Sequence, residues 1–156
     1  MSRRLVHLGL GAALLLTASA CQKPSPGITL VSGSATTHFE AQEWCRGGAV
    51  LTKGDECPGT GPSRVQIVRA DEGGQVGIDV DSDLADQGWY VFDADTEQIL
   101  LGISGDHYRT FLADFSQAKI TGVQQLEVRT VDHVPTSSTD IPKVTGQWAF
   151  QVVAKV

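Results

Sequence analysis

From residue 28 onward, apolar residues recur in short groups that are separated by glycine, proline and acidic residues. The segment 75–80 alternates, with Val76, Ile78 and Val80 on one face, which is the period of a half-buried β-strand. The closing segment alternates in the same way and places Trp148 and Phe150 on one face. Groups of this kind predict strands over residues 28–31, 64–69, 75–80, 88–92, 98–101, 107–112, 126–131 and 146–156.

The predicted strands follow one another at intervals of about 8–12 residues, a spacing typical of an antiparallel sandwich or barrel. We therefore expect an all-β, immunoglobulin-like antiparallel β-sandwich of about 7–9 short strands. Residues 135–146 are expected to form a long hairpin loop between the last two strands, and helical evidence is confined to a turn around 113–119. The chain shows no internal repeat, so residues 28–156 are predicted to form one domain.

The first 20 residues have the order of a secretory signal. Arg3 and Arg4 are followed by the apolar segment 5–16 and the small residues 17–20. An apolar stretch of about a dozen residues falls short of the roughly 20 that a membrane-spanning helix needs. Residues 1–20 are therefore predicted to be a signal peptide that is removed.

Cys21 follows Ala18-Ser19-Ala20, which resembles the lipobox of bacterial lipoproteins. In that class the peptidase cuts before a cysteine that carries a diacylglyceryl group. The alternative is an ordinary signal peptide cleaved near Ala20, with Cys21 as a free thiol. We expect a lipidated Cys21 and a short tether over 21–27, which would anchor the domain through fatty acids, palmitate among them, on the extracytoplasmic side of the cell membrane.

The net charge of the chain limits the classes of partner that it can bind. The first 20 residues hold two of the 12 basic residues and none of the 18 acidic ones, so the mature chain has ten basic residues, 18 acidic residues and a net charge of −8. This balance excludes nucleic acid, which needs basic surface, and leaves membrane attachment to the acyl chains. The chain contains no asparagine, which indicates a GC-rich genome such as that of an actinobacterium.

Two cysteines remain after Cys21. An even pair in an exported domain predicts a disulfide, here between Cys45 and Cys57. The alternative is a redox pair, which usually has the spacing Cys-x-x-Cys. The longer spacing in this chain favours a structural bridge.

The segment 79–86 contains an acidic run that resembles the start of a calcium-binding loop. Asp79, Asp81 and Asp83 occupy the first ligand positions of an EF-hand, but Leu84 stands where that loop needs glycine. The run, which continues to Asp86, is more simply a polar strand edge and acidic turn. We therefore expect no metal and no other cofactor, with these residues as weak metal candidates.

Ser104, Asp106 and His107 have the residue types of a hydrolase triad. Neighbours in an extended chain point apart, and the Gly-x-Ser-x-Gly pattern is incomplete, so a turn before a strand is expected instead. His38 and His133 lie far apart in the sequence and are expected at the surface.

The aromatic residues are expected in the core. Trp89, Tyr90 and Trp148 stand in the centres of predicted strands, where burial is more common than a place in a ligand cleft. Trp44 is expected either to pack on the disulfide or to lie exposed near the tether.

The lipobox, "EWC" with its partner Cys57, "GWYVFDAD" and the closing "GQWAFQV" together resemble an actinobacterial lipoprotein family, domain of unknown function family 2771. The resemblance implies an exported, lipid-anchored β domain and carries over Cys21, Cys45, Cys57 and Trp89. It implies no activity.

Two functions follow from these patterns. The first is a non-catalytic binding or assembly module at the outer face of the membrane, with an envelope protein as its partner. The alternative is an envelope-acting enzyme whose site is built from loops and leaves no motif in the sequence. Because no catalytic motif is complete, we favour the binding module, although fold alone does not decide function.

Overall fold

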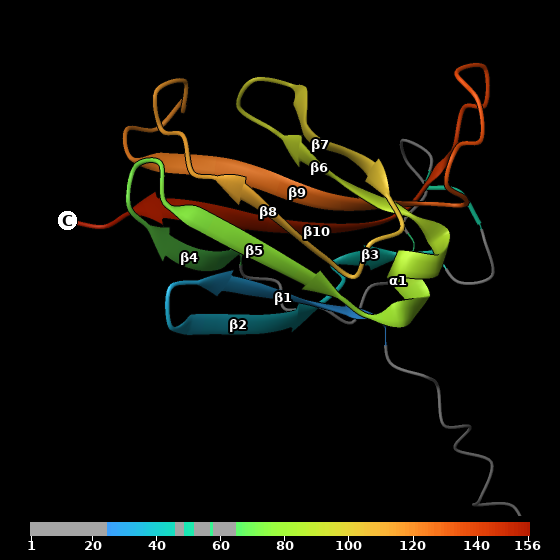
Figure 1. Ribbon diagram of the computed structural model, residues 1–156, viewed down its shortest axis with the longest axis horizontal. Coiled ribbons are helices and arrows are strands. Elements are labelled where there is room, and N and C mark those ends of the chain that lie inside the picture. Colours follow the sequence, from blue (N-terminus) through green and yellow to red (C-terminus); the bar gives the residue numbers. More distant parts are fainter. Residues whose placement is uncertain (1–24, 46–48, 52–56, 58–64) are drawn as a thin grey trace, which may run out of the picture.

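The computed structural model describes residues 25–45, 49–51, 57 and 65–156. Over these residues the chain forms two packed β-sheets and one short helix (Figure 1). The predicted all-β sandwich is therefore confirmed. The elements are β1 (Gly27–Ser32), β2 (Ala35–Glu40), β3 (Glu43–Trp44), β4 (Gln66–Ala70), β5 (Gln75–Val80), α1 (Ser82–Gln87), β6 (Trp89–Asp93), β7 (Gln98–Ser104), β8 (Tyr108–Leu112), β9 (Val123–Val131) and β10 (Val144–Ala154).

The smaller sheet has the strand order β2-β1-β5-β8, and all its pairs are antiparallel. Its inner face carries Ile28, Leu30 and Ile78, which are fully buried. The alternation in 75–80 is borne out, because Val76, Ile78 and Val80 all point into the core.

The larger sheet has the order β3-β10-β9-β6-β7, and β4 also pairs with β10. β3 covers only Gly146 and Gln147 of β10, so the rest of that edge is open to β4. β4 runs parallel to β10, which departs from the otherwise antiparallel arrangement. The predicted hairpin between the last two strands is present, since β9 and β10 pair antiparallel.

Three tryptophans occupy the space between the sheets, where Trp89 and Trp148 are fully buried. The Trp148 indole donates to the Pro26 carbonyl at 3.3 Å, and the Trp89 indole donates to the Asp106 carbonyl at 2.6 Å. Trp44 is buried against Trp148, with ring centroids 5.9 Å apart. The expectation that these rings form core is confirmed, and the exposed alternative for Trp44 is wrong.

The pattern of apolar residues missed two strands and a helix. In β2 only Phe39 is buried, so the strand gives almost no alternation, and β3 has two residues. The segment expected to be an acidic turn is instead α1, which buries Leu84 and Ala85. No helix forms at 113–119, where a single turn joins the Ala118 amide to the Phe115 carbonyl, and the ten strands of the described residues exceed the number predicted.

The packed part of the domain begins before the first predicted strand. Ser25 is buried and donates to Glu40 at 3.1 Å, and β1 starts at Gly27. The Gly27 amide donates to Asp81 at 2.8 Å, directly before α1. The segment 25–27, which was expected to be tether, is therefore part of the sandwich.

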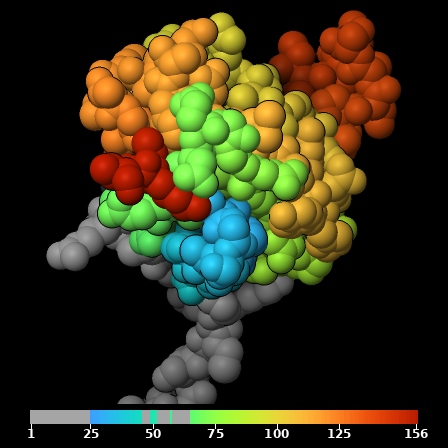
Figure 2. All heavy atoms as spheres, turned by 60° about the vertical axis from the view of Figure 1, so that its left-hand side comes forward, coloured from blue at the N-terminus to red at the C-terminus, as the bar shows by residue number. Residues whose placement is uncertain are grey.

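The two ends of the sandwich differ. The start of β1 lies beside α1, and the C-terminus lies at the opposite end (Figure 1). We call these the N-terminal end and the far end. Turns between strands meet at the far end, where the β1–β2 turn, the β4–β5 turn and the C-terminal residues lie side by side (Figure 2).

Candidate functional site

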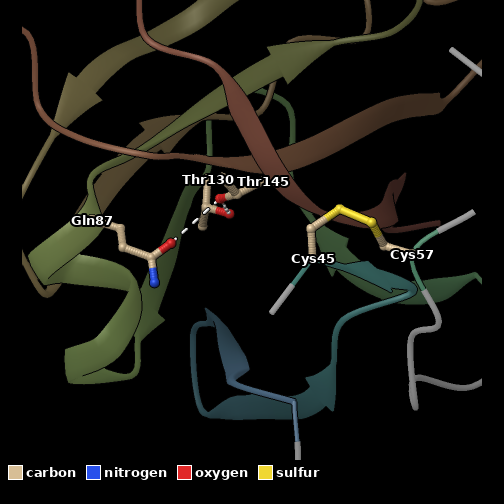
Figure 3. Close-up of a disulfide and its surroundings, with 5 residues drawn as sticks. All are labelled: Cys45, Cys57, Gln87, Thr130 and Thr145. Carbon is tan, nitrogen blue, oxygen red and sulfur yellow. Dashed lines mark hydrogen bonds between the residues drawn. A yellow bond between two sulfur atoms is a disulfide. The ribbon is translucent and has the colours of Figure 1, made fainter. Parts of the chain in front are cut away.

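The predicted disulfide joins Cys45 to Cys57, which are 12 positions apart (Figure 3). The Cys45 amide donates to the Thr145 carbonyl at 2.8 Å, so the bridge is fastened to β10. The Thr145 hydroxyl lies 3.1 Å from that of Thr130, and both side chains are buried. The disulfide itself is confirmed, and these contacts favour a structural bridge over a redox pair. Cys21 lies outside the described residues.

The acidic run is divided between three structural settings. Asp79 is exposed on β5, Asp81 precedes α1 and accepts from the Gly27 amide, and Asp83 lies in α1. Across the described part of the chain, no group of three or more histidine, cysteine or acidic side chains is arranged to hold a metal ion. The arrangement gives the weak metal candidates no support.

The Ser104–Asp106–His107 segment forms the turn expected before β8. Ser104 donates to the Asp106 carboxylate at 2.6 Å, and the Asp106 amide donates back to Ser104 at 3.1 Å. His107 is exposed, and its side chain makes no hydrogen bond to either residue in the structure described. His38 and His133 are exposed, as predicted.

Two hollows formed by described residues lie at the far end. The larger, of about 370 Å³, has Tyr108 and three glycines in its wall. Its polar groups bond to one another or to nearby groups, because Lys155 pairs with Asp71 at 3.4 Å and Gln75 donates to Thr110 at 3.0 Å. Few of them are left for a ligand.

The smaller hollow has about 140 Å³ and lies beside the first residues of β7. We call it the β7 hollow. It is formed where the β6–β7 turn meets the β8–β9 loop, by Asp93, Thr96, Gln98, Ile99, Leu100, Asp114, Gln117, Ala118 and Gln124.

Two buried polar side chains form the inner part of the β7 hollow. Asp93 is 7% exposed and Gln124 is 2% exposed. The Asp93 carboxylate accepts the amides of Asp95 and Thr96 through Oδ1, at 2.8 and 3.1 Å. Its Oδ2 accepts the Gln124 amide group at 3.0 Å, and Gln124 Oε1 accepts the Asp114 backbone amide at 3.3 Å. Gln124 therefore holds the turn and the loop together.

The same turn buries a second carboxylate. Asp95 is 9% exposed, and its Oδ2 accepts the Gln125 amide at 2.9 Å. Its Oδ1 is buried without a hydrogen-bond partner in the described structure. Lys119 lies nearby, but its amino group donates to the Ala94 carbonyl at 3.2 Å. Among the described residues, no basic side chain forms an ion pair with the two buried carboxylates of this turn.

Asp114 forms the opposite wall of the hollow. Hydrogen bonds from the Ser116 hydroxyl and then from its backbone amide hold the pKa of Asp114 below its usual value, so this carboxyl group stays ionised at neutral pH. Ile99 and Leu100 complete the rim, and they are 60% and 37% exposed. The β7 hollow therefore combines carboxylates with an apolar rim.

β7 itself is an edge strand, because it pairs only with β6 among the described residues. Its register against β6 shifts between Ile99 and Leu101, so Leu100 is an extra residue in the strand. Such a bulge explains why two successive apolar side chains are both exposed. The strand, Gln98-Ile-Leu-Leu-Gly-Ile-Ser104, contains no charged residue and no proline.

The predicted strands 88–92 and 98–101 leave 93–97 only as the connection between them, and nothing in the sequence analysis singles out Gln124. A local signal was present, since Asp93 and Asp95 directly follow an apolar strand and so begin next to the core. The partner Gln124 is 31 positions away, and nothing in its own segment marks it. Comparison of the chain with protein-family models, curated proteins and solved structures finds no match.

Proposed function

We propose that this chain is a lipid-anchored, extracytoplasmic binding module that presents its far end to an envelope protein. One observation carries the proposal. The start of β1 and the two hollows lie at opposite ends of the sandwich. A domain held through Cys21 would therefore direct its open turns away from the lipid surface. Membership of the actinobacterial lipoprotein family is part of the same proposal.

Among the described residues, no helix has the length and hydropathy of a membrane span. We assign attachment to fatty acids on Cys21, as the resemblance of residues 18–21 to a lipobox predicts. A protein with more than one acyl chain is stably bound to a bilayer. With a net charge of −8 after residues 1–20 are removed, the domain gains no attraction to anionic lipid.

A photocrosslinking amino acid in place of Gln117, at the far end, tests the proposal in intact cells. We expect one discrete crosslinked species from this position. The matched position is Asp86 in α1, which is also exposed but lies at the N-terminal end. Equal crosslinking from both positions would contradict presentation by the far end.

The anchor is tested by Cys21→Ser. The variant should lose fatty-acid labelling and leave the membrane fraction, and the crosslinked species from Gln117 should disappear with it. Continued labelling of the variant in the membrane fraction would refute the lipoprotein assignment.

A further inference from the structure

The open edge of β7 is unlike the other edges of the sandwich. Proteins usually protect edge strands by making them short or by placing charges on them. Of the other edge strands, β2 ends at Glu40, β8 contains Arg109, β4 contains Arg69, and β3 has two residues. β7 has seven uncharged residues and exposes two large apolar side chains. β7 carries no charge of its own, and among the described residues only the bulge at Leu100 and the Arg109 guanidinium, which donates to the Gly102 carbonyl, oppose its pairing with another strand.

The hollow at the start of β7 has the charge of a site for a cation. Asp93 and Asp114 line it, and lysine, arginine and histidine are absent from its lining. Asp93 Oδ2 accepts one hydrogen bond in the described structure, so one lone pair remains. The three hydrogen bonds to Asp93 offset part of the cost of burying its charge, and an incoming ammonium or guanidinium group would compensate the rest.

The unpartnered oxygen of Asp95 is a second, independent sign of the same imbalance. It lies two residues from Asp93 on the same turn and is buried. Lys119, the nearby cation, contacts the Ala94 carbonyl and is not part of the lining. Asp95 is not part of the lining either, so it adds to the negative potential of the turn, while Asp93 is the buried carboxylate that a ligand in the hollow would meet.

The volume of the β7 hollow and its apolar rim limit which ligands can enter it. Small-molecule sites usually have about 300–1,000 Å³, and the β7 hollow has about 140 Å³. The apolar rim of Ile99 and Leu100 suits the methylene stem of a long basic side chain, which packs on apolar surface while its charge reaches polar groups. The hollow thus fits one lysine or arginine side chain better than a free metabolite.

We propose that β7 accepts an extended segment of a partner protein as an added strand, and that a lysine or arginine of that segment enters the β7 hollow. In strand addition, backbone hydrogen bonds supply affinity and side-chain pockets supply specificity. The inference rests on the proposed function, because it names the chemistry of the partner that the far end binds. Charge complementarity selects a basic segment over a second copy of this acidic chain.

The edge is tested with a displayed library of random seven-residue peptides, selected on the full chain in detergent micelles. We expect binders that protect β7 amides from hydrogen exchange. Gly102→Lys places a charge on the edge where a side chain meets no neighbour, and it should abolish binding. The matched control, Thr36→Lys on the edge strand β2, should leave binding unchanged.

The hollow is tested with the selected peptides. Binders should share a lysine or arginine at one position, and its replacement by methionine should weaken binding about tenfold. Asp114→Asn keeps the acceptor for Ser116 and should weaken only the basic peptide, by about 2- to 5-fold, because this carboxylate is exposed. Asp93→Asn should have a larger effect, and Asp79→Asn on the exposed face of β5 should have none.

Failure of the cation site, of strand addition and of the proposed function would each give a different result. Peptides that protect β7 without a shared basic residue would overturn the cation site and leave strand addition standing. A library that yields no β7-dependent binder, or a Gly102-sensitive dimer of the protein alone, would overturn strand addition by a partner. Neither result affects crosslinking from Gln117 in cells, which tests the proposed function separately.

Discussion

At the scale of single residues, the far end is organised by polar side chains that the core has buried. Asp93 is tolerated in a buried position because three N–H groups donate to it, two from its own turn and one from Gln124. The same turn leaves one oxygen of Asp95 unpartnered. Buried carboxylates with incomplete hydrogen bonding are unusual in a stable domain, and here they lie next to an open strand edge.

His133 gives a prediction at this scale. The ring lies between Asp140, at 2.7 Å, and Asp132, at 2.9 Å. The hydrogen bond with Asp140, aided by the charges of Asp140 and Asp132, raises the pKa of His133 above its usual value. Because the folded-state pKa is higher than the unfolded one, the stabilising contribution of His133 is fully present below about pH 6.5 and is lost as the pH rises through the folded pKa.

His133→Gln should therefore lower the free energy of unfolding most near pH 5.5 and least near pH 8.5, as measured by urea denaturation at each pH. Asp140→Asn is the matched variant, and an NMR titration of the His133 ring should show a lower pKa in it. The same loss of stability at both pH values would argue against the ion pairs.

At the scale of elements, the long strand β10 organises the larger sheet. It pairs with β9 along its length on one side, while β3 and β4 share its other side. β3 pairs with β10 over two residues, and the Gln42 side chain beside it adds two hydrogen bonds to Ala149. The Cys45–Cys57 bridge follows β3 directly and adds a covalent constraint.

The disulfide gives the prediction at this scale. Cys45→Ala with Cys57→Ala should lower the free energy of unfolding by about 3 kcal/mol, because the unfolded chain regains the freedom of the closed loop. Urea denaturation measures the change, and hydrogen exchange should show faster exchange at the residue 45 amide than at β9 amides. A reducing agent should lower the stability of the natural chain to that of the variant. Equal stability of the two oxidised proteins would contradict a structural role.

At the scale of the whole molecule, the segment between Cys21 and the packed domain is short. Ser25 already packs against the domain, so four peptide steps separate it from Cys21. Fully extended, they reach at most about 14 Å. With the proposed lipid on Cys21, the domain would stay close to the bilayer, and its far end would extend furthest from it.

Lengthening the tether tests whether this height matters. A long Gly/Ser linker inserted between Lys23 and Pro24 avoids Pro26, whose carbonyl accepts the Trp148 indole. We expect unchanged stability and a lower yield of the crosslinked species from Gln117. The same linker after Ser138, in the exposed β9–β10 loop, is the control and should leave the yield unchanged. An undiminished yield with the longer tether would show that height above the membrane is unimportant.

The sequence by itself determined the all-β class, most strands and the disulfide. These features depend on local alternation, on turn residues and on an even pair of cysteines, all of which are visible in one segment at a time. β5 was predicted with its observed bounds because Val76, Ile78 and Val80 all face the core.

Only the tertiary structure decided what the local pattern does not encode. β2 is held by pairing with β1 rather than by its own apolar residues, and α1 forms because Leu84 and Ala85 find a core to enter. The β7 hollow brings together residues from 93–100, 114–118 and 124, which are separate segments of the chain. Whether a carboxylate such as Asp93 is exposed or buried depends on partners such as Gln124, and their proximity exists only after the two sheets have packed.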